Sequence, residues 1–171
     1  MTSVFTYTGQ QVDPESPDPA QFRIEDIAHA LARQPAHLGH TVAFYSKAQR
    51  AVILSSLLIE PGAQWAALLW YATHAYDVTG PALCSSHPLA RCIREVFRVT
   101  DPHPAAIVNA EERLAACERI QLFRVINVPL PADRIKMVPV SVSEAEGMFL
   151  ARYADLVEAG NLDRTPKPRV G

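Results

Sequence analysis

The sequence predicts an all-α protein, a single-domain bundle of about six or seven helices with an extended N-terminal arm. Its 171 residues, 49% of them hydrophobic and 20% charged, suit one globular domain with a substantial core. Apolar residues recur at three- and four-residue spacing along most of the chain, and prolines and helix-capping sequences separate these stretches. We place the domain in residues 1–160 and a flexible C-terminal tail in residues 161–171.

Charge and cysteine content exclude several classes of protein. The formal net charge of −2 gives no bulk attraction to nucleic acid or to an anionic membrane. No apolar run reaches the roughly 18 residues that cross a bilayer, and residues 1–7 lack the pattern of a signal peptide. The three cysteines, an odd number without paired spacing, disfavour a disulfide framework. We therefore expect a cytoplasmic protein with no nucleic-acid or membrane partner.

The N-terminal segment predicts an arm followed by a helix. Residues 13–19 hold three prolines and are excluded from helical interiors, so residues 1–20 are expected to be loop-like. Within them, residues 4–7 are expected to form a short strand or to pack as an extended arm. Apolar residues at helical spacing predict the first helix over residues 24–34, which Pro35 ends.

Two buried helices are predicted next. A capping box opens the first near Ser46, with Gln49 reaching back to the cap, and its apolar body extends to Ile59. The second covers residues 65–77 and is the expected central helix, with Trp70 and Tyr71 beside each other on it. Its core stripe is formed by Trp65, Leu68, Leu69, Ala72 and Tyr76.

The C-terminal half predicts further helices over residues 89–99 and 105–122, with Cys92 and Cys117 in the core. The charges of Glu111-Glu112-Arg113 and Glu118-Arg119 are expected on a solvated face. Asp133 is expected to cap a short helix through Met137, and Pro139 predicts a break at residues 138–142. A second capping box at Ser143-Glu144-Ala145-Glu146 then opens a helix to about Glu158, with Gly160 as its C-terminal cap.

Several stretches resemble the HD-domain metal-dependent phosphohydrolases, in particular their small 5′-deoxynucleotidase-like and phage dNTPase-like branch. The similarity covers about residues 1–79 and 130–157, whereas residues 80–129 match poorly. The matching segments are, in order, Thr6-Tyr7-Thr8-Gly9, Ile24-Glu25-Asp26-Ile27-Ala28-His29-Ala30-Leu31, Gly39-His40-Thr41, Phe44-Tyr45-Ser46, Ala66-Ala67-Leu68-Leu69 with Ala75-Tyr76, and Ile135-Lys136 with Glu146.

The resemblance implies a metal site whose ligands this sequence has replaced. In the family a histidine, an adjacent His-Asp pair and a distant aspartate hold a divalent cation, which polarises phosphate and generates a hydroxide nucleophile. Here Arg50 stands in place of the first histidine, Trp70 and Tyr71 in place of the pair, and Pro139 in place of the aspartate. A guanidinium cannot ligate a cation and an indole N–H only donates. We therefore expect no metal and no other cofactor.

The altered site predicts a pseudoenzyme that binds a nucleotide-like or other phosphorylated small molecule without cleaving it. A guanidinium suits phosphate, and aromatic rings stack bases. The residues expected to bind the ligand are Arg50, Trp70, Tyr71, His74, His40 and Tyr45.

Three alternatives remain open. Trp70 and Tyr71 can fill the former site as core while Arg50 pairs with an acidic residue such as Asp77. Catalysis can persist at a relocated metal or a metal-free acid/base site built from His74, Asp77 and His40; the weakest form of this hypothesis pairs Cys84 with His87. Finally, residues 80–129, with Phe97, Phe123 and Val125, can form a dimer or partner surface in a regulatory module. The resemblance to HD-domain proteins, which often oligomerise, implies a homo-oligomer.

Overall fold

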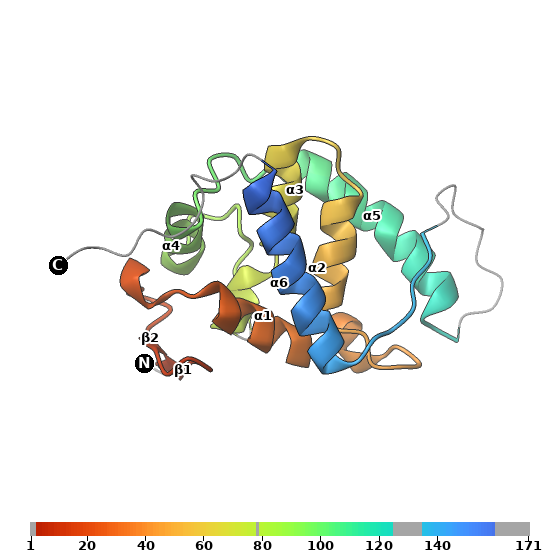
Figure 1. Cartoon of the computed structure of the whole chain (residues 1–171), viewed down its shortest axis with the longest axis horizontal. Coiled ribbons are helices and arrows are strands. Elements are labelled where there is room, and N and C mark those ends of the chain that lie inside the picture. The colour runs from red at the N-terminus through yellow and green to blue at the C-terminus, as the bar shows by residue number, and fades with distance from the viewer. Residues whose placement is uncertain (1–2, 78, 125–134, 160–171) are drawn as a thin grey trace.

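Helices dominate the computed structural model, which describes residues 3–77, 79–124 and 135–159. These residues form six α-helices, three short 3-10 helices and one two-stranded hairpin (Figure 1), which confirms the all-α prediction. In order, the elements are β1 (Val4–Phe5), β2 (Gln11–Val12), η1 (Pro19–Gln21), α1 (Ile24–Arg33), η2 (Ala36–Gly39), α2 (Lys47–Ser56), α3 (Pro61–Leu68), η3 (Ala72–Ala75), α4 (Pro88–Val96), α5 (Pro104–Gln121) and α6 (Val142–Glu158). None of the helices in the described residues is long and apolar enough to cross a membrane.

The core lies where α6 crosses α1, α2 and α3 (Figure 1). Six aromatic side chains are fully or almost fully buried there and around it, and one of them is anchored: Trp65 Nε1 donates to the Phe97 carbonyl at 2.9 Å. The predicted stripe on the segment after Pro61 is confirmed, because all five of its members are buried. The six aromatic residues are Phe22, Tyr45, Trp65, Tyr76, Phe97 and Phe149.

The N-terminal arm is a hairpin fastened to α1. Val4 pairs with Val12 in antiparallel register. The turn is held by Asp26, whose Oδ1 accepts from Thr8 N at 2.7 Å and whose Oδ2 accepts from Thr8 Oγ1 at 2.8 Å. Asp26 is only 2% exposed, so one side of this first helix is occupied by the arm.

The helix after Ser46 begins as predicted but is stabilised differently. Ser46 accepts from Gln49 N at 3.1 Å, which confirms the cap. The prediction that the Gln49 side chain reaches back to the cap is wrong. Gln49 Nε2 donates to Val138 O at 2.7 Å and its Oε1 accepts from Val140 N at 3.3 Å, because the incoming extended segment offers main-chain groups that need buried partners. The helix ends at Ser56, and Ile59, predicted to be buried, is 95% exposed.

The expected central helix over residues 65–77 is wrong as one continuous element. The α-helix ends at Leu68, and Leu69 and Tyr71 have ψ angles of 3° and 9°, so the chain turns before η3. Trp70 and Tyr71 lie in this turn. In a continuous helix neighbouring side chains point about 100° apart. The turn instead allows both to donate to one carboxylate of α5.

The C-terminal half corrects four expectations. Glu118 is fully buried rather than solvated, and Phe97 is buried rather than part of an exposed partner surface. The break at Pro139 is confirmed, but the cap of α6 is Ser141, which accepts from Glu144 N, and not Ser143. The segment 135–141 is not helical, while Val125, Asp133, Gly160 and the tail lie outside the described residues. Cys92 and Cys117 are buried as predicted.

Candidate functional site

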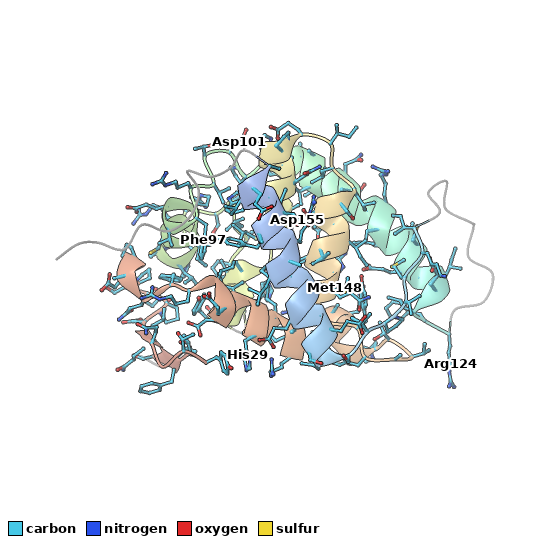
Figure 2. The ribbon with its side chains drawn as sticks, in the orientation of Figure 1. His29, Phe97, Asp101, Arg124, Met148 and Asp155 are labelled. Atoms are coloured by element: carbon cyan, nitrogen blue, oxygen red, sulfur yellow. The ribbon has the colours of Figure 1, made fainter. Side chains whose placement is uncertain are left out.

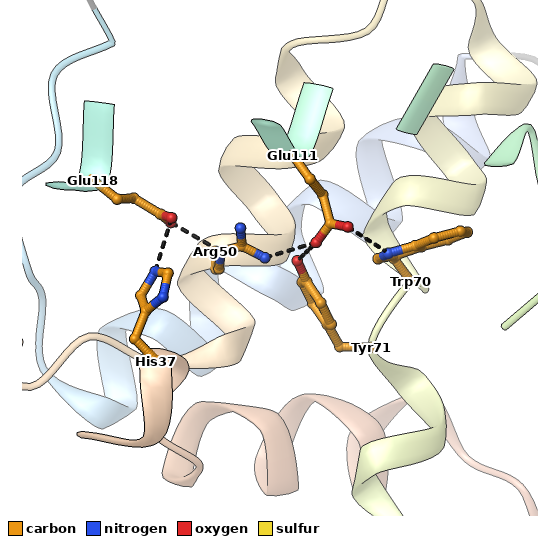
Figure 3. Close-up of polar contacts among 6 residues, drawn as sticks. All are labelled: His37, Arg50, Trp70, Tyr71, Glu111 and Glu118. Atoms are coloured by element: carbon orange, nitrogen blue, oxygen red, sulfur yellow. Dashed lines mark hydrogen bonds and ion pairs between the residues drawn. The ribbon is translucent and has the colours of Figure 1, made fainter. Parts of the chain in front are cut away.

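Arg50, Trp70 and Tyr71, which the sequence places in one ligand site, belong to a network of ion pairs and hydrogen bonds centred on Arg50. Its Nη1 donates to Glu111 Oε1 at 2.8 Å and its Nε to Glu118 Oε1 at 2.9 Å (Figure 3). The two carboxylates extend from α5 toward α2, where the guanidinium side chain is only 11% exposed. Two acidic partners therefore compensate this cation, and Asp77, the partner expected from the sequence, is not one of them.

Glu111 also holds both aromatic residues of the turn. Its Oε2 accepts from Trp70 Nε1 at 3.2 Å, and its Oε1 accepts from the Tyr71 hydroxyl. The Arg50 guanidinium lies over the Tyr71 ring, 5.4 Å from its centre. Trp70 and Tyr71 thus serve as hydrogen-bond donors to a carboxylate, whereas metal ligands supply lone pairs.

Glu118 is the buried end of this network. Its Oε2 accepts from His37 Nε2 at 2.8 Å, so each of its oxygens has one strong donor. Tyr45 lies beside it, with its ring stacked 6.4 Å from that of His37. Burial first, and the Glu118 carboxylate second, raise the pKa of Tyr45 far above its usual range. We call His37, Arg50, Trp70, Tyr71, Glu111 and Glu118 the Arg50 cluster.

A second cation lies one turn away on the same helix and is held very differently. Lys47 Nζ donates to Gln34 Oε1 at 3.0 Å and lies 2.7 Å from His74 Nδ1. Gln34 in turn donates from Nε2 to the His74 carbonyl at 2.8 Å. Both acceptors are neutral, and none of the carboxylates in the described residues forms an ion pair with Lys47. An ammonium has three N–H donors, so one remains available.

The surroundings lower the pKa of both members of this Lys47–His74 pair. Desolvation lowers the pKa of Lys47. Desolvation, and then the nearby ammonium of Lys47, lower the pKa of His74, against a smaller opposing effect of Asp77. Gly80 packs directly on the ring: a Cβ at that position would lie 2.5 Å from His74 Cδ2. The lowered pKa favours the neutral imidazole, whose Nδ1 can then accept from the Lys47 ammonium.

The structure brings together some of the predicted site residues and separates others. Arg50, Trp70 and Tyr71 share the Glu111 carboxylate, and the rings of Tyr71 and His74 are 6.1 Å apart. Tyr45 is buried behind the cluster, whereas His40 is exposed on the loop after η2.

The residues offered for relocated catalysis do not form one constellation. Asp77 Oδ1 accepts from the Thr79 amide and hydroxyl. His87 caps α4 through Nδ1, which accepts from Leu89 N, and Cys84 is exposed. Across residues 3–77, 79–124 and 135–159, no three His, Cys, Asp or Glu side chains are grouped so as to hold a metal ion.

Sequence reasoning missed Lys47, Gln34 and the two glutamates of α5. A signal for the glutamates was present, because Glu111 and Glu118 follow Ile107 by four and eleven residues and therefore share its buried helical face. The spacing of Lys47 and Arg50, three residues apart, likewise places both cations on one face of their helix. Gln34 had no such signal, because its contacts depend on the turn before η3.

Comparison with known proteins adds one relative. No protein-family model matches the chain. The chain is 28% identical, over 179 aligned residues, to YfdR of Escherichia coli strain K12. The alignment covers 92% of this chain and 97% of YfdR, which is described only as an uncharacterized protein.

Proposed function

We propose that this protein is a catalytically degenerate relative of the HD-domain phosphohydrolases that binds a nucleotide or another phosphorylated small molecule without metal-dependent hydrolysis. The observation that carries the proposal is the half-buried Lys47 ammonium, whose two acceptors are neutral and whose third N–H is available. A buried or half-buried charge is normally paired, and a phosphate oxygen is a suitable partner.

The proposed absence of metal-dependent hydrolysis is supported by the side chains that stand at the expected ligand positions. The positions that resemble metal ligands hold a guanidinium, an indole and a phenol, and these donate to Glu111 and Glu118. A divalent cation placed among them would be repelled by the positive charge of Arg50. It could bind Glu111 and Glu118 only if both carboxylates broke their ion pairs with Arg50. The residues present therefore do not fit the family's metal, and no step of the proposal uses one.

In this proposal Lys47 binds the phosphate, whereas the sequence favoured Arg50 for that role. A phosphate at Arg50 would have to displace two carboxylates, whereas at Lys47 it would add a counterion to an uncompensated charge. His74 contacts Lys47 and supplies a hydrogen-bonding imidazole, and the Tyr71 ring lies 6.1 Å from the His74 ring. Arg50 is thus assigned to holding the site together, and Lys47 to binding.

The test is binding of inorganic phosphate and of a deoxynucleoside monophosphate, measured by calorimetry on folded protein. Lys47→Met should weaken binding about ten- to a hundredfold, the value of a charge-assisted hydrogen bond, and Lys47→Arg should retain part of it. Lys136→Met is the matched control, because Lys136 is exposed and distant in sequence. Mass spectrometry of small molecules released on denaturation identifies any co-purified ligand.

Two results would overturn the proposal. Equal affinity in wild-type and Lys47→Met protein would exclude Lys47 as the anchor. Release of inorganic phosphate from the monophosphate on addition of Mn²⁺ or Co²⁺, abolished by chelation, would show that metal-dependent hydrolysis survives.

A further inference from the structure

The hairpin and α1 enclose a hollow that lies apart from both cations. Its volume is about 310 Å³, near the lower end of the range for small-molecule sites. Its lining joins the hairpin to the first helix and to the end of η3, and includes Val4, Phe5, Tyr7, Asp26, His29 and Tyr76. His29 lies on the lower edge of α1 in the view of Figure 2, beside the hairpin.

One side of the hollow is an aromatic platform. The rings of Tyr7 and His29 are stacked, with centres 3.8 Å apart and planes 10° from parallel. Glu146 fixes the imidazole by accepting from His29 Nδ1 at 3.3 Å, and Arg33 holds Glu146 in turn at 2.8 Å. Tyr7 is nevertheless 66% exposed and Phe5 75% exposed. Two large rings thus border the hollow without protein covering them.

The other side carries buried polar groups with hydrogen-bonding capacity to spare. Each oxygen of Asp26 accepts one bond from Thr8, but a carboxylate has about four acceptor sites. The Tyr76 hydroxyl is buried, and although Asp26 and the Arg23 backbone lie close enough to act on its pKa, none of the described residues forms a hydrogen bond with it. The acceptor capacity that a ligand can use on this side of the hollow is therefore that of the Asp26 carboxylate.

We propose that this hollow binds a nucleobase or nucleoside, stacked on the Tyr7–His29 pair and donating N–H groups to Asp26. A base offers a flat π face, N–H donors and ring acceptors together, and base–aromatic stacking is favourable for every base. Among the described residues that line the hollow there is no lysine or arginine, and the Asp26 carboxylate repels phosphate, so the phosphate-free compound is the fitting ligand. The inference does not depend on the proposed phosphate site, because Lys47 is not among the described residues that line the hollow.

The experiment is a titration of ¹⁵N-labelled full-length protein with adenosine, guanosine, cytidine and thymidine. The Thr8 amide reports on the site directly, because it donates to Asp26 Oδ1. At least one nucleoside should shift this resonance saturably. Tyr7→Ala should weaken that binding about five- to a hundredfold, the range for loss of one stacking partner, whereas Tyr7→Phe should remain within about twofold.

Control variants distinguish binding in this hollow from binding at Lys47 and from a general loss of folding. Ile59→Ala removes an exposed apolar side chain far from the hollow in sequence and should leave the affinity unchanged. Lys47→Met should also leave it unchanged. No saturable shift with any of the four nucleosides, binding that survives Tyr7→Ala, or binding lost only in Lys47→Met would each overturn the proposal.

Discussion

Two cations on α2, one helical turn apart, have opposite surroundings. Arg50 donates to two carboxylates, one of them fully buried, and also lies over an aromatic ring. Lys47 meets only an amide oxygen and an imidazole nitrogen, and burial lowers its pKa. The first charge is neutralised within the protein, whereas the second is half-buried and uncompensated.

The difference separates a structural role from a binding role. An ion pair that is complete inside the fold gives a phosphate little to gain, since binding there must break existing contacts. A desolvated ammonium without a carboxylate partner gains a counterion when an anion arrives. Two cations on one helix therefore support different functions, and the contrast between Arg50 and Lys47 can be tested through stability.

The largest effect is expected from Arg50→Met. This change leaves Glu118, which is fully buried, without its guanidinium partner, and breaking a buried ion pair costs about 3–5 kcal/mol. Urea denaturation of the variant should show a loss of this size in the free energy of unfolding. Arg119→Met, at an exposed position of α5, is the control and should change stability by less than about 0.5 kcal/mol.

A double variant tests the cause of that loss. In Arg50→Met/Glu118→Gln the orphaned charge is gone, so a good part of the lost stability should return. A loss below about 1 kcal/mol in Arg50→Met alone would mean that the guanidinium is not what neutralises the cluster, and the contrast with Lys47 would fail.

A smaller effect is expected from Gly80→Ala, which disturbs the other cation. Gly80 has a φ angle of +36°, and an added Cβ would overlap the His74 ring. Positive-φ strain and overpacking together should lower the free energy of unfolding by about 1–3 kcal/mol. The ring would have to leave Lys47, so the variant should also lose phosphate affinity.

The control for this change is Gly147→Ala on α6. Gly147 is exposed, and a Cβ there meets nothing within 4 Å. Alanine should stabilise the helix by about 0.5–1 kcal/mol. If Gly80→Ala were equally harmless, the imidazole would not be held by its neighbour as described.

The elements that follow from local sequence could be predicted, and those that depend on distant contacts could not. The helices over residues 24–33 and 104–121 follow from apolar spacing and bounding prolines, and the break at Pro139 follows from its missing N–H. The helix expected over residues 65–77 failed because Glu111, some forty residues away, accepts from both Trp70 and Tyr71 and so favours a turn.

The same limit applies to the site. The resemblance places Arg50, Trp70 and Tyr71 in one site, and one alternative from the sequence pairs Arg50 with an acidic residue such as Asp77. The actual partners, Glu111 and Glu118, lie in the stretch that matches the family least. Lys47 was read only as part of a capping sequence, since nothing local indicates that its neighbours are neutral.

The smallest effect concerns pH and sharpens the description of the Lys47–His74 pair. The pKa of His74 is lowered, chiefly by desolvation and then by Lys47, so the folded protein binds fewer protons than the unfolded chain just below about pH 6.5. Stability from this residue is therefore complete above that pH and is lost as pH falls toward the lowered pKa. The slope cannot exceed about 1.4 kcal/mol per pH unit for one proton.

Other groups titrate in the same range, so the measurement is the difference in urea stability between wild type and His74→Gln from pH 7 to 5. An NMR titration of the ring in Lys47→Met should give a higher pKa than in wild type, still below the usual value because burial remains. An unchanged His74 pKa in that variant would show that the two groups do not interact, and the pair would no longer explain why this cation is poised for an anion.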